Sequence, residues 1–108
     1  MLTYAAILFG IAALGGLVLA FVKERPIFLA IIHGLVAATA LVLLIIGVIQ
    51  GDAETLPTVA LILFVVAALG GFVLFAFHLR GRKLPRGLIY VHGLLAVIAE
   101  VLLIIGII

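Results

Sequence analysis

Four long apolar runs constrain this chain more than any other feature of its sequence. They cover residues 3–22, 27–49, 58–79 and 87–108. A bilayer core of about 30 Å is crossed by about 20 helical residues, and each run reaches that length. Because lipid offers no hydrogen-bond partners, a spanning segment must satisfy its own backbone groups, so each run is expected to be an α-helix.

The composition supports a membrane protein and excludes a soluble domain. Of the 108 residues, 69% are hydrophobic and 9% are charged, whereas about 25% are charged in a typical soluble domain. A soluble domain of this size has too little interior to bury so much apolar surface. Since no basic residue precedes Lys23, the first run does not resemble a signal peptide and is expected to stay as a membrane helix. The sequence therefore predicts an all-α integral membrane four-helix bundle.

Three short polar segments separate the runs, and their charges predict the orientation. All six basic residues lie in or beside the first and third segments: Lys23, Arg25, Arg80, Arg82, Lys83 and Arg86. The second segment carries only Asp52 and Glu54. By the positive-inside rule, the first and third segments lie in the cytoplasm and both termini lie outside. We expect a prokaryotic inner membrane as the location, and a net charge of +2 gives no reason to expect a nucleic-acid partner.

The second half of the chain repeats the first. The segment ILFGIAALGGLVLAF at 7–21 matches ILFVVAALGGFVLFA at 62–76, and LLIIGVI at 43–49 matches LLIIGII at 102–108. Each half holds two runs, so the halves insert in the same orientation and are expected to be related by a pseudo-twofold axis along the membrane normal. The expected units are a first transmembrane hairpin at 1–50, an extracytoplasmic linker at 51–57 and a second transmembrane hairpin at 58–108.

Both halves keep a histidine that is followed by a glycine. His33 lies seven residues after Pro26 and His92 lies seven after Pro85, which places each imidazole ~10 Å into its helix. Two histidines at one depth on different helices can supply both axial ligands of a haem b iron. This general layout resembles that of membrane b-type cytochromes. The resemblance implies electron transfer, with a quinone in the lipid as a candidate partner.

Glycines and basic residues complete the expected haem site. Glycine allows close approach of the backbone to a flat ligand, and arginines at the cytoplasmic end can pair with the haem propionates. The expected cofactor-binding residues are His33, His92, Gly34, Gly93, Gly16, Gly71, Arg25 and Arg86.

Two other interpretations of these residues stay open. Small residues let membrane helices pack closely, and a neutral histidine can hydrogen-bond across a helix interface, so packing alone explains the repeated pairs. In the other interpretation, His78 joins His33 and His92 in a zinc or copper site.

Glu100 is the only charged residue well inside an apolar run, and its counterpart in the repeat is Leu41. It could carry protons, as acidic residues in membrane pumps do, or donate a hydrogen bond between helices. The stretch IAEVLLIIG at 98–106 resembles part of the small multidrug-resistance transporters. That family places its essential glutamate in the first helix, where this chain has no acidic residue.

The sequence thus leads to three ordered hypotheses about function. The first is a small b-type cytochrome with bis-histidine ligation. The second is a non-catalytic accessory subunit of a larger membrane complex, or of a homo-oligomer. The third is a proton-coupled transporter or channel that uses Glu100. Without cysteine, and without a nucleophile–base pair, the chain is expected to be an electron carrier or membrane subunit rather than a stand-alone enzyme.

Overall fold

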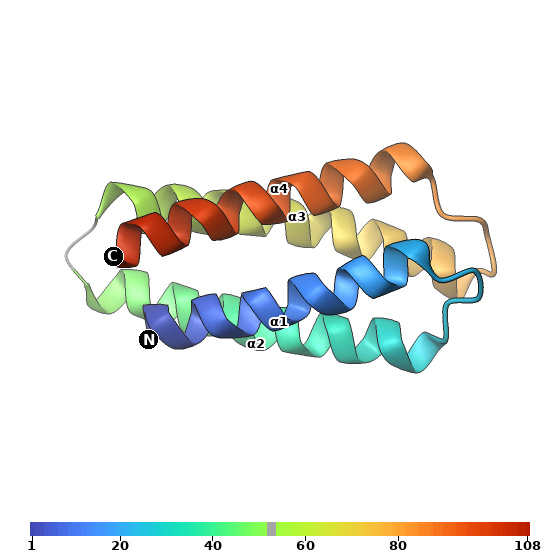
Figure 1. Ribbon diagram of the computed structural model, residues 1–108, viewed down its shortest axis with the longest axis horizontal. Coiled ribbons are helices and arrows are strands. Elements are labelled where there is room, and N and C mark those ends of the chain that lie inside the picture. Colours follow the sequence, from blue (N-terminus) through green and yellow to red (C-terminus); the bar gives the residue numbers. More distant parts are fainter. Residues whose placement is uncertain (52–53) are drawn as a thin grey trace.

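Four α-helices build the structure, a computed structural model that describes residues 1–51 and 54–108 (Figure 1). They are α1 (Leu2–Phe21), α2 (Ile27–Gln50), α3 (Thr55–Leu79) and α4 (Arg86–Ile107). No residue in the described ranges belongs to a strand. Each helix is long and apolar enough to cross a membrane. The predicted fold class, an all-α membrane four-helix bundle, is confirmed.

Prolines mark the start of three helices, but they occupy two different positions. Pro26 and Pro85 are the residues immediately before α2 and α4. Pro57 instead lies within the first turn of α3, which begins at Thr55 and so starts three residues before the predicted run. The first turn of a helix needs no backbone N–H for its own hydrogen bonds, and proline is therefore tolerated there. Of the predicted linker, residues 52 and 53 lie outside the described ranges.

The helices form two antiparallel hairpins that lie side by side (Figure 1). The closest neighbours are α1 with α2 and α3 with α4, and the hairpins meet through α1 with α4 and α2 with α3. The remaining two pairs, α1 with α3 and α2 with α4, lie diagonally across the bundle, with no Cα atoms within 8 Å of each other in the described helices. Only side chains can therefore meet across the centre.

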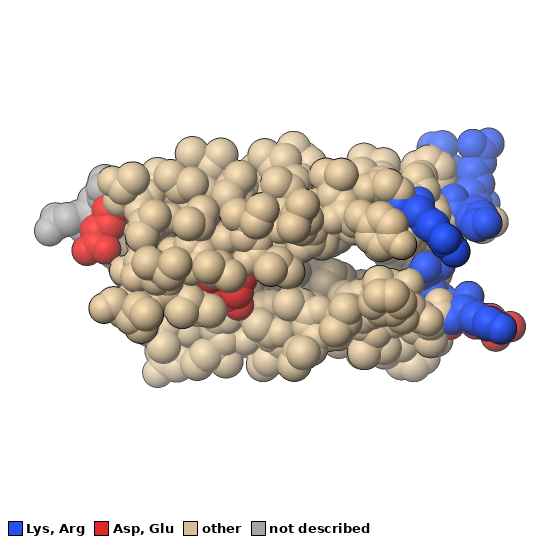
Figure 2. Space-filling view, turned by 45° about the horizontal axis from the view of Figure 1, so that its top comes forward, with Lys and Arg blue, Asp and Glu red and all other residues tan. Residues whose placement is uncertain are grey.

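The two ends of the bundle differ in charge. All Lys and Arg side chains gather at the end that holds the α1–α2 and α3–α4 connections, which we call the basic end (Figure 2). Both termini lie at the opposite end, which we call the terminal end (Figure 1). Between the ends the surface is almost entirely apolar, with large side chains such as Leu14 and Phe72 exposed at 67% and 70%. This apolar belt is the surface that a lipid bilayer would cover.

The packed core lies in the half of the bundle toward the terminal end. Phe9 of α1 and Phe64 of α3 stack across the diagonal with ring centroids 3.6 Å apart. Around them lies the rest of the core cluster of buried residues: Ala5, Ala40, Leu44, Ala60, Ala99 and Leu103. In the sequence alignment of the two halves, every one of these residues pairs with another core residue, as Phe9 does with Phe64 and Leu44 with Leu103.

The half toward the basic end is packed less tightly. There the buried hydrophobic side chains of the described residues are Ala12, Ala67 and Leu74. Figure 2 shows the surface hollowed between the two hairpins in this half. The two histidines of the repeated pairs belong to this half, so they lie where the centre of the bundle is least filled.

Candidate functional site

The fold brings the two repeated histidines together. His33 projects from α2 and His92 from α4, the diagonal pair of helices. Their ring centroids are 6.4 Å apart and the ring planes are nearly perpendicular, at 83°. The two imidazoles therefore lie close together at the centre of the bundle, with their planes nearly perpendicular. The order of the helices along the chain does not by itself require this closeness.

One nitrogen of each ring is held by a backbone carbonyl of the neighbouring helix. His33 Nδ1 donates to the carbonyl oxygen of Ala12 at 2.8 Å, and His92 Nδ1 donates to that of Ala67 at 2.7 Å. A carbonyl can only accept, so Nδ1 carries the hydrogen in both rings. In the neutral imidazole, Nε2 then keeps its lone pair. This arrangement is typical of a histidine that binds a metal through Nε2.

Two glycines leave room for the imidazoles. A Cβ added at Gly16 would lie 2.9 Å from His33 Cε1, and one at Gly71 would lie 3.1 Å from His92 Cε1. Such distances are shorter than ordinary van der Waals contact, so a larger residue would displace the rings. By contrast, a Cβ added at Gly34 or Gly93 meets nothing within 4 Å. The glycines in contact with the rings are thus on the facing helices, α1 and α3, and not those that follow the histidines.

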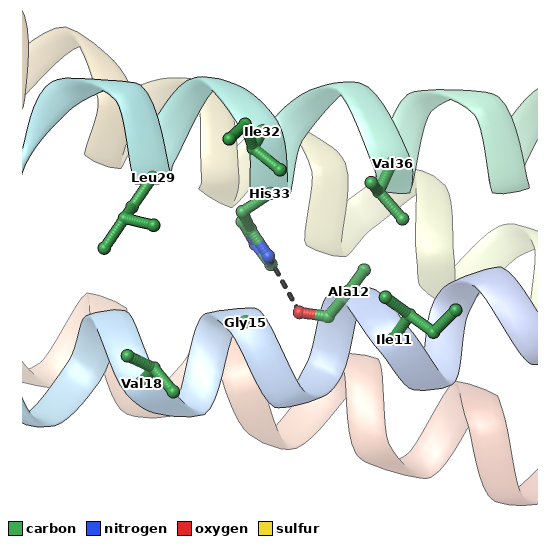
Figure 3. Close-up of a pocket in the computed structure, with 8 residues that line it drawn as sticks. All are labelled: Ile11, Ala12, Gly15, Val18, Leu29, Ile32, His33 and Val36. Carbon is green, nitrogen blue, oxygen red and sulfur yellow. Dashed lines mark hydrogen bonds between the residues drawn. The ribbon is translucent and has the colours of Figure 1, made fainter.

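A small apolar crevice lies beside His33. Figure 3 shows the His33 ring pointing from α2 toward Ala12 and Gly15 of α1. The crevice holds about 190 Å³ and is lined by Ile11, Ala12, Gly15, Val18, Leu29, Ile32, His33 and Val36. Ligand pockets usually hold about 300–1,000 Å³, so this crevice alone is too small for a large cofactor.

Of the two arginines expected to bind propionates, Arg25 is engaged in the fold. Its Nε donates to the carbonyl oxygen of Leu19 at 2.8 Å, and Nη2 donates to that of Ala20 at 3.4 Å. These carbonyls belong to the last turn of α1, where helical partners are missing. Arg86 is the first residue of α4 and is exposed at the basic end.

His78 stands apart from the other two histidines. It lies in the last turn of α3, where its ring is near that of Phe75, with centroids 6.5 Å apart. Within the described ranges, no three His, Asp or Glu side chains are grouped so that they could hold a metal ion. The structure thus brings His33 and His92 together and leaves His78 outside the pair.

Glu100 lies between α4 and α1, away from both ends of the bundle. A Cβ added at Gly10 of α1 would be 3.4 Å from Glu100 Oε2. The other carboxyl oxygen, Oε1, is buried and has no hydrogen-bond partner among the described residues. The carboxyl group therefore lies against α1 at Gly10, at a distance where an added Cβ would touch Oε2.

Three groups that contribute to these sites were not predicted from the sequence. The carbonyls of Ala12 and Ala67 orient the imidazoles, and Gly10 accommodates the carboxyl of Glu100. Backbone carbonyls have no signature of their own, although both alanines belong to the repeated AALGG segment. Gly10 could have been found from the repeat, because its counterpart is Val65.

Comparisons with protein-family models, with curated proteins and with solved structures gave no match. The fold and the site together define a membrane four-helix bundle with two facing imidazoles. The function is therefore argued from the chemistry of that site.

Proposed function

We propose that this chain is a small membrane b-type cytochrome, in which Nε2 of His33 and Nε2 of His92 are the axial ligands of a haem b iron. The observation that carries the proposal is the pair of facing imidazoles. Both rings have Nδ1 committed to a carbonyl, which leaves Nε2 as the ligating atom. Haem iron with two imidazole ligands is typical of sites that transfer electrons and do not bind a substrate at the iron.

The separation of the rings fits one metal ion between them. Two metal–nitrogen bonds of about 2 Å, added to two imidazole radii of roughly 1 Å, give roughly 6 Å between the ring centres. The observed separation is 6.4 Å. An edge-to-face contact between two rings also allows centroids about 4.5–7 Å apart, whereas a hydrogen bond between the rings would place them closer.

The porphyrin needs more space than the crevice beside His33 provides. The half of the bundle toward the basic end can open most easily to provide it. Its centre holds few buried side chains, whereas the terminal half is filled by the stacked Phe9 and Phe64. We therefore expect the hairpins to separate at the basic end when haem binds, while the terminal half stays packed.

The charge asymmetry supports an orientation for the bound cofactor. With the basic end in the cytoplasm, the propionates would point toward that end, where Arg86 and Arg82 are exposed. Both termini would then lie outside a prokaryotic inner membrane. Bound haem supplies reversible one-electron transfer. The protein orients both ligands and shields them from water, and a quinone in the lipid is the expected redox partner.

Haem binding can be tested by titrating the detergent-purified protein with haemin and recording visible spectra before and after dithionite. We expect a Soret band that shifts on reduction. Because each imidazole is one axial ligand, His33→Ala and His92→Ala should each abolish the bis-histidine spectrum. His78→Ala is the matched control and should leave it intact. If the wild-type protein shows only the spectrum of free haemin after the addition, or if all three variants behave alike, the proposal fails.

A second candidate function is a non-catalytic subunit that packs against another membrane helix. One observation favours it: Gly34 and Ala38, one turn apart on α2, are both exposed and leave a smooth surface. Small residues at this spacing allow close approach of a second helix. Isolation in a mild detergent tests this candidate, since an accessory subunit should co-purify with its partner complex or as a stable homo-oligomer.

A further inference from the structure

We propose that Glu100 and Gly10 form a proton-binding site in the interior of the membrane, and that this site takes up a proton when the haem is reduced. The redox coupling rests on the proposed cytochrome function. The existence of the proton site does not, because it is argued from the interface between α1 and α4.

The carboxyl group of Glu100 is packed at the helix interface without a hydrogen-bond partner, among the residues that the structure describes, for one of its oxygens. Oε2 of Glu100 lies against Gly10, at 3.4 Å from the position of an added Cβ, and Oε1 is buried without a partner in the described part of the chain. A carboxyl held only for structural reasons would be expected to donate or accept a hydrogen bond at this depth. The unpartnered oxygen leaves the group available to bind and release a proton.

Both residues of the site depart from the repeat. Glu100 aligns with Leu41, and Gly10 aligns with Val65. The two interfaces between hairpins, α1 with α4 and α2 with α3, therefore differ at this position. At the interface of α1 with α4, Gly10 faces Glu100. The corresponding residues at the interface of α2 with α3 are Val65 and Leu41. Because Gly10 and Glu100 lie against each other, the two departures from the repeat belong to one site.

The described residues place no charged partner beside the carboxyl group of Glu100. On the described helices packed against α4, the titratable side chains are Tyr4 of α1 and His78 of α3. Tyr4 is largely exposed near the terminal end, and His78 lies in the last turn of α3 at the basic end. On α4 itself, the nearest is His92, two turns away. With no cation beside it, the carboxyl group can change charge by exchanging a proton.

The position of Glu100 couples it to the histidine pair. Glu100 lies eight residues beyond His92 on the same helix, or ~12 Å along its axis. An electron added at the histidine pair makes the interior more negative, and in a medium of low dielectric constant this favours protonation of a nearby carboxylate. The charges balance with a quinol as reductant. With haem bound, one quinol would supply two electrons and two protons to two protein molecules, and each would accept one electron at its haem and one proton at Glu100.

Potentiometric titration of the haem-loaded protein at a series of pH values tests the coupling. In the wild type, the midpoint potential should fall as pH rises, by up to about 59 mV for each tenfold change in proton concentration. In Glu100→Gln the potential should not depend on pH over the same range. Glu24→Gln, an exposed acid at the basic end, is the control and should keep the wild-type slope. Equal slopes in Glu100→Gln and wild type would overturn the redox coupling.

The proton site itself is tested without haem, by treating the full chain in detergent with a hydrophobic carbodiimide. This reagent adds to a protonated carboxyl group within an apolar environment, so mass spectrometry should find the adduct on Glu100 at neutral pH and not on Glu54. An unmodified Glu100 would overturn the proton site. If the protein binds no haem but Glu100 is modified, the cytochrome proposal and the redox coupling fail while the proton site stands.

Discussion

At the scale of single residues, the glycines near the histidines are of two kinds. Gly16 and Gly71 lie directly against the imidazoles, while Gly34 and Gly93 face open space. All four are repeated in the sequence, so repetition does not distinguish them. The distinction matters because only Gly16 and Gly71 limit the positions that the imidazole rings can adopt. Each of these rings is held between a carbonyl and a glycine of the facing helix.

The matched pair Gly16→Ala and Gly34→Ala tests this distinction. In Gly16→Ala the new methyl group would lie 2.9 Å from His33 Cε1, so the ring, whose Nδ1 is hydrogen-bonded to Ala12, must shift. Overpacking of this kind costs about 1–3 kcal/mol, so haem affinity should fall about tenfold. Gly34→Ala should bind haem like the wild type. Haemin titration measures both variants, and equal affinities would show that the contact at Gly16 does not constrain His33.

At the scale of the helices, the sequence predicts where each helix begins and ends better than it predicts which face of the helix packs against its neighbours. Pro26 and Pro85 precede α2 and α4 as the sequence predicts, because proline cannot continue the preceding helix. The start of α3 was predicted three residues too late, since Pro57 is accommodated in the first turn. The end of α1 depends on a contact that no local pattern predicted, in which Arg25 folds back onto the carbonyls of Leu19 and Ala20.

Replacement of Arg25 should therefore destabilise the C-terminal end of α1 more than it alters haem binding. In Arg25→Ala the carbonyls of the last turn of α1 lose a charged donor, at a cost of about 1 kcal/mol. Lys23→Ala is the control, because Lys23 is exposed in the same connection. Thermal unfolding in detergent should show a lower midpoint for Arg25→Ala alone. If both variants unfold at the wild-type temperature, the Arg25 contacts contribute nothing to stability.

At the scale of the whole molecule, the bundle consists of a packed half and an open half. Stacked phenylalanines fill the terminal half, and the paired imidazoles lie in the less filled basic half. Glu100 and Gly10 lie at the contact between the two hairpins. A cofactor between the imidazoles and a proton on Glu100 would both depend on how the hairpins meet, so both proposals concern this interface.

The orientation of the whole bundle can be tested with single cysteines, because the natural chain has none. With the basic end in the cytoplasm, Gln50→Cys should react with a membrane-impermeant maleimide added outside intact cells, since Gln50 ends α2 at the terminal end. Lys23→Cys should react only after the membrane is permeabilised. The reverse pattern would place the basic end outside and contradict the proposed topology.

The sequence by itself determined the number of helices, the class of protein and the charge asymmetry of its ends. Four apolar runs of spanning length leave the backbone no alternative to helix in lipid. The repeat also showed that the two histidines share one depth, because each follows its proline by the same number of residues. These properties depend on the number of residues between features of the chain, which can be counted in the sequence.

Only the tertiary structure decided which residues face one another. That His33 meets His92, that Gly16 and not Gly34 lies against an imidazole, and that Gly10 faces Glu100 all depend on the rotation of each helix about its own axis. In a soluble protein, alternating apolar and polar positions reveal that rotation. Here nearly every position of every helix is apolar, so the periodic signal is weak and the packing of small residues sets the rotation instead.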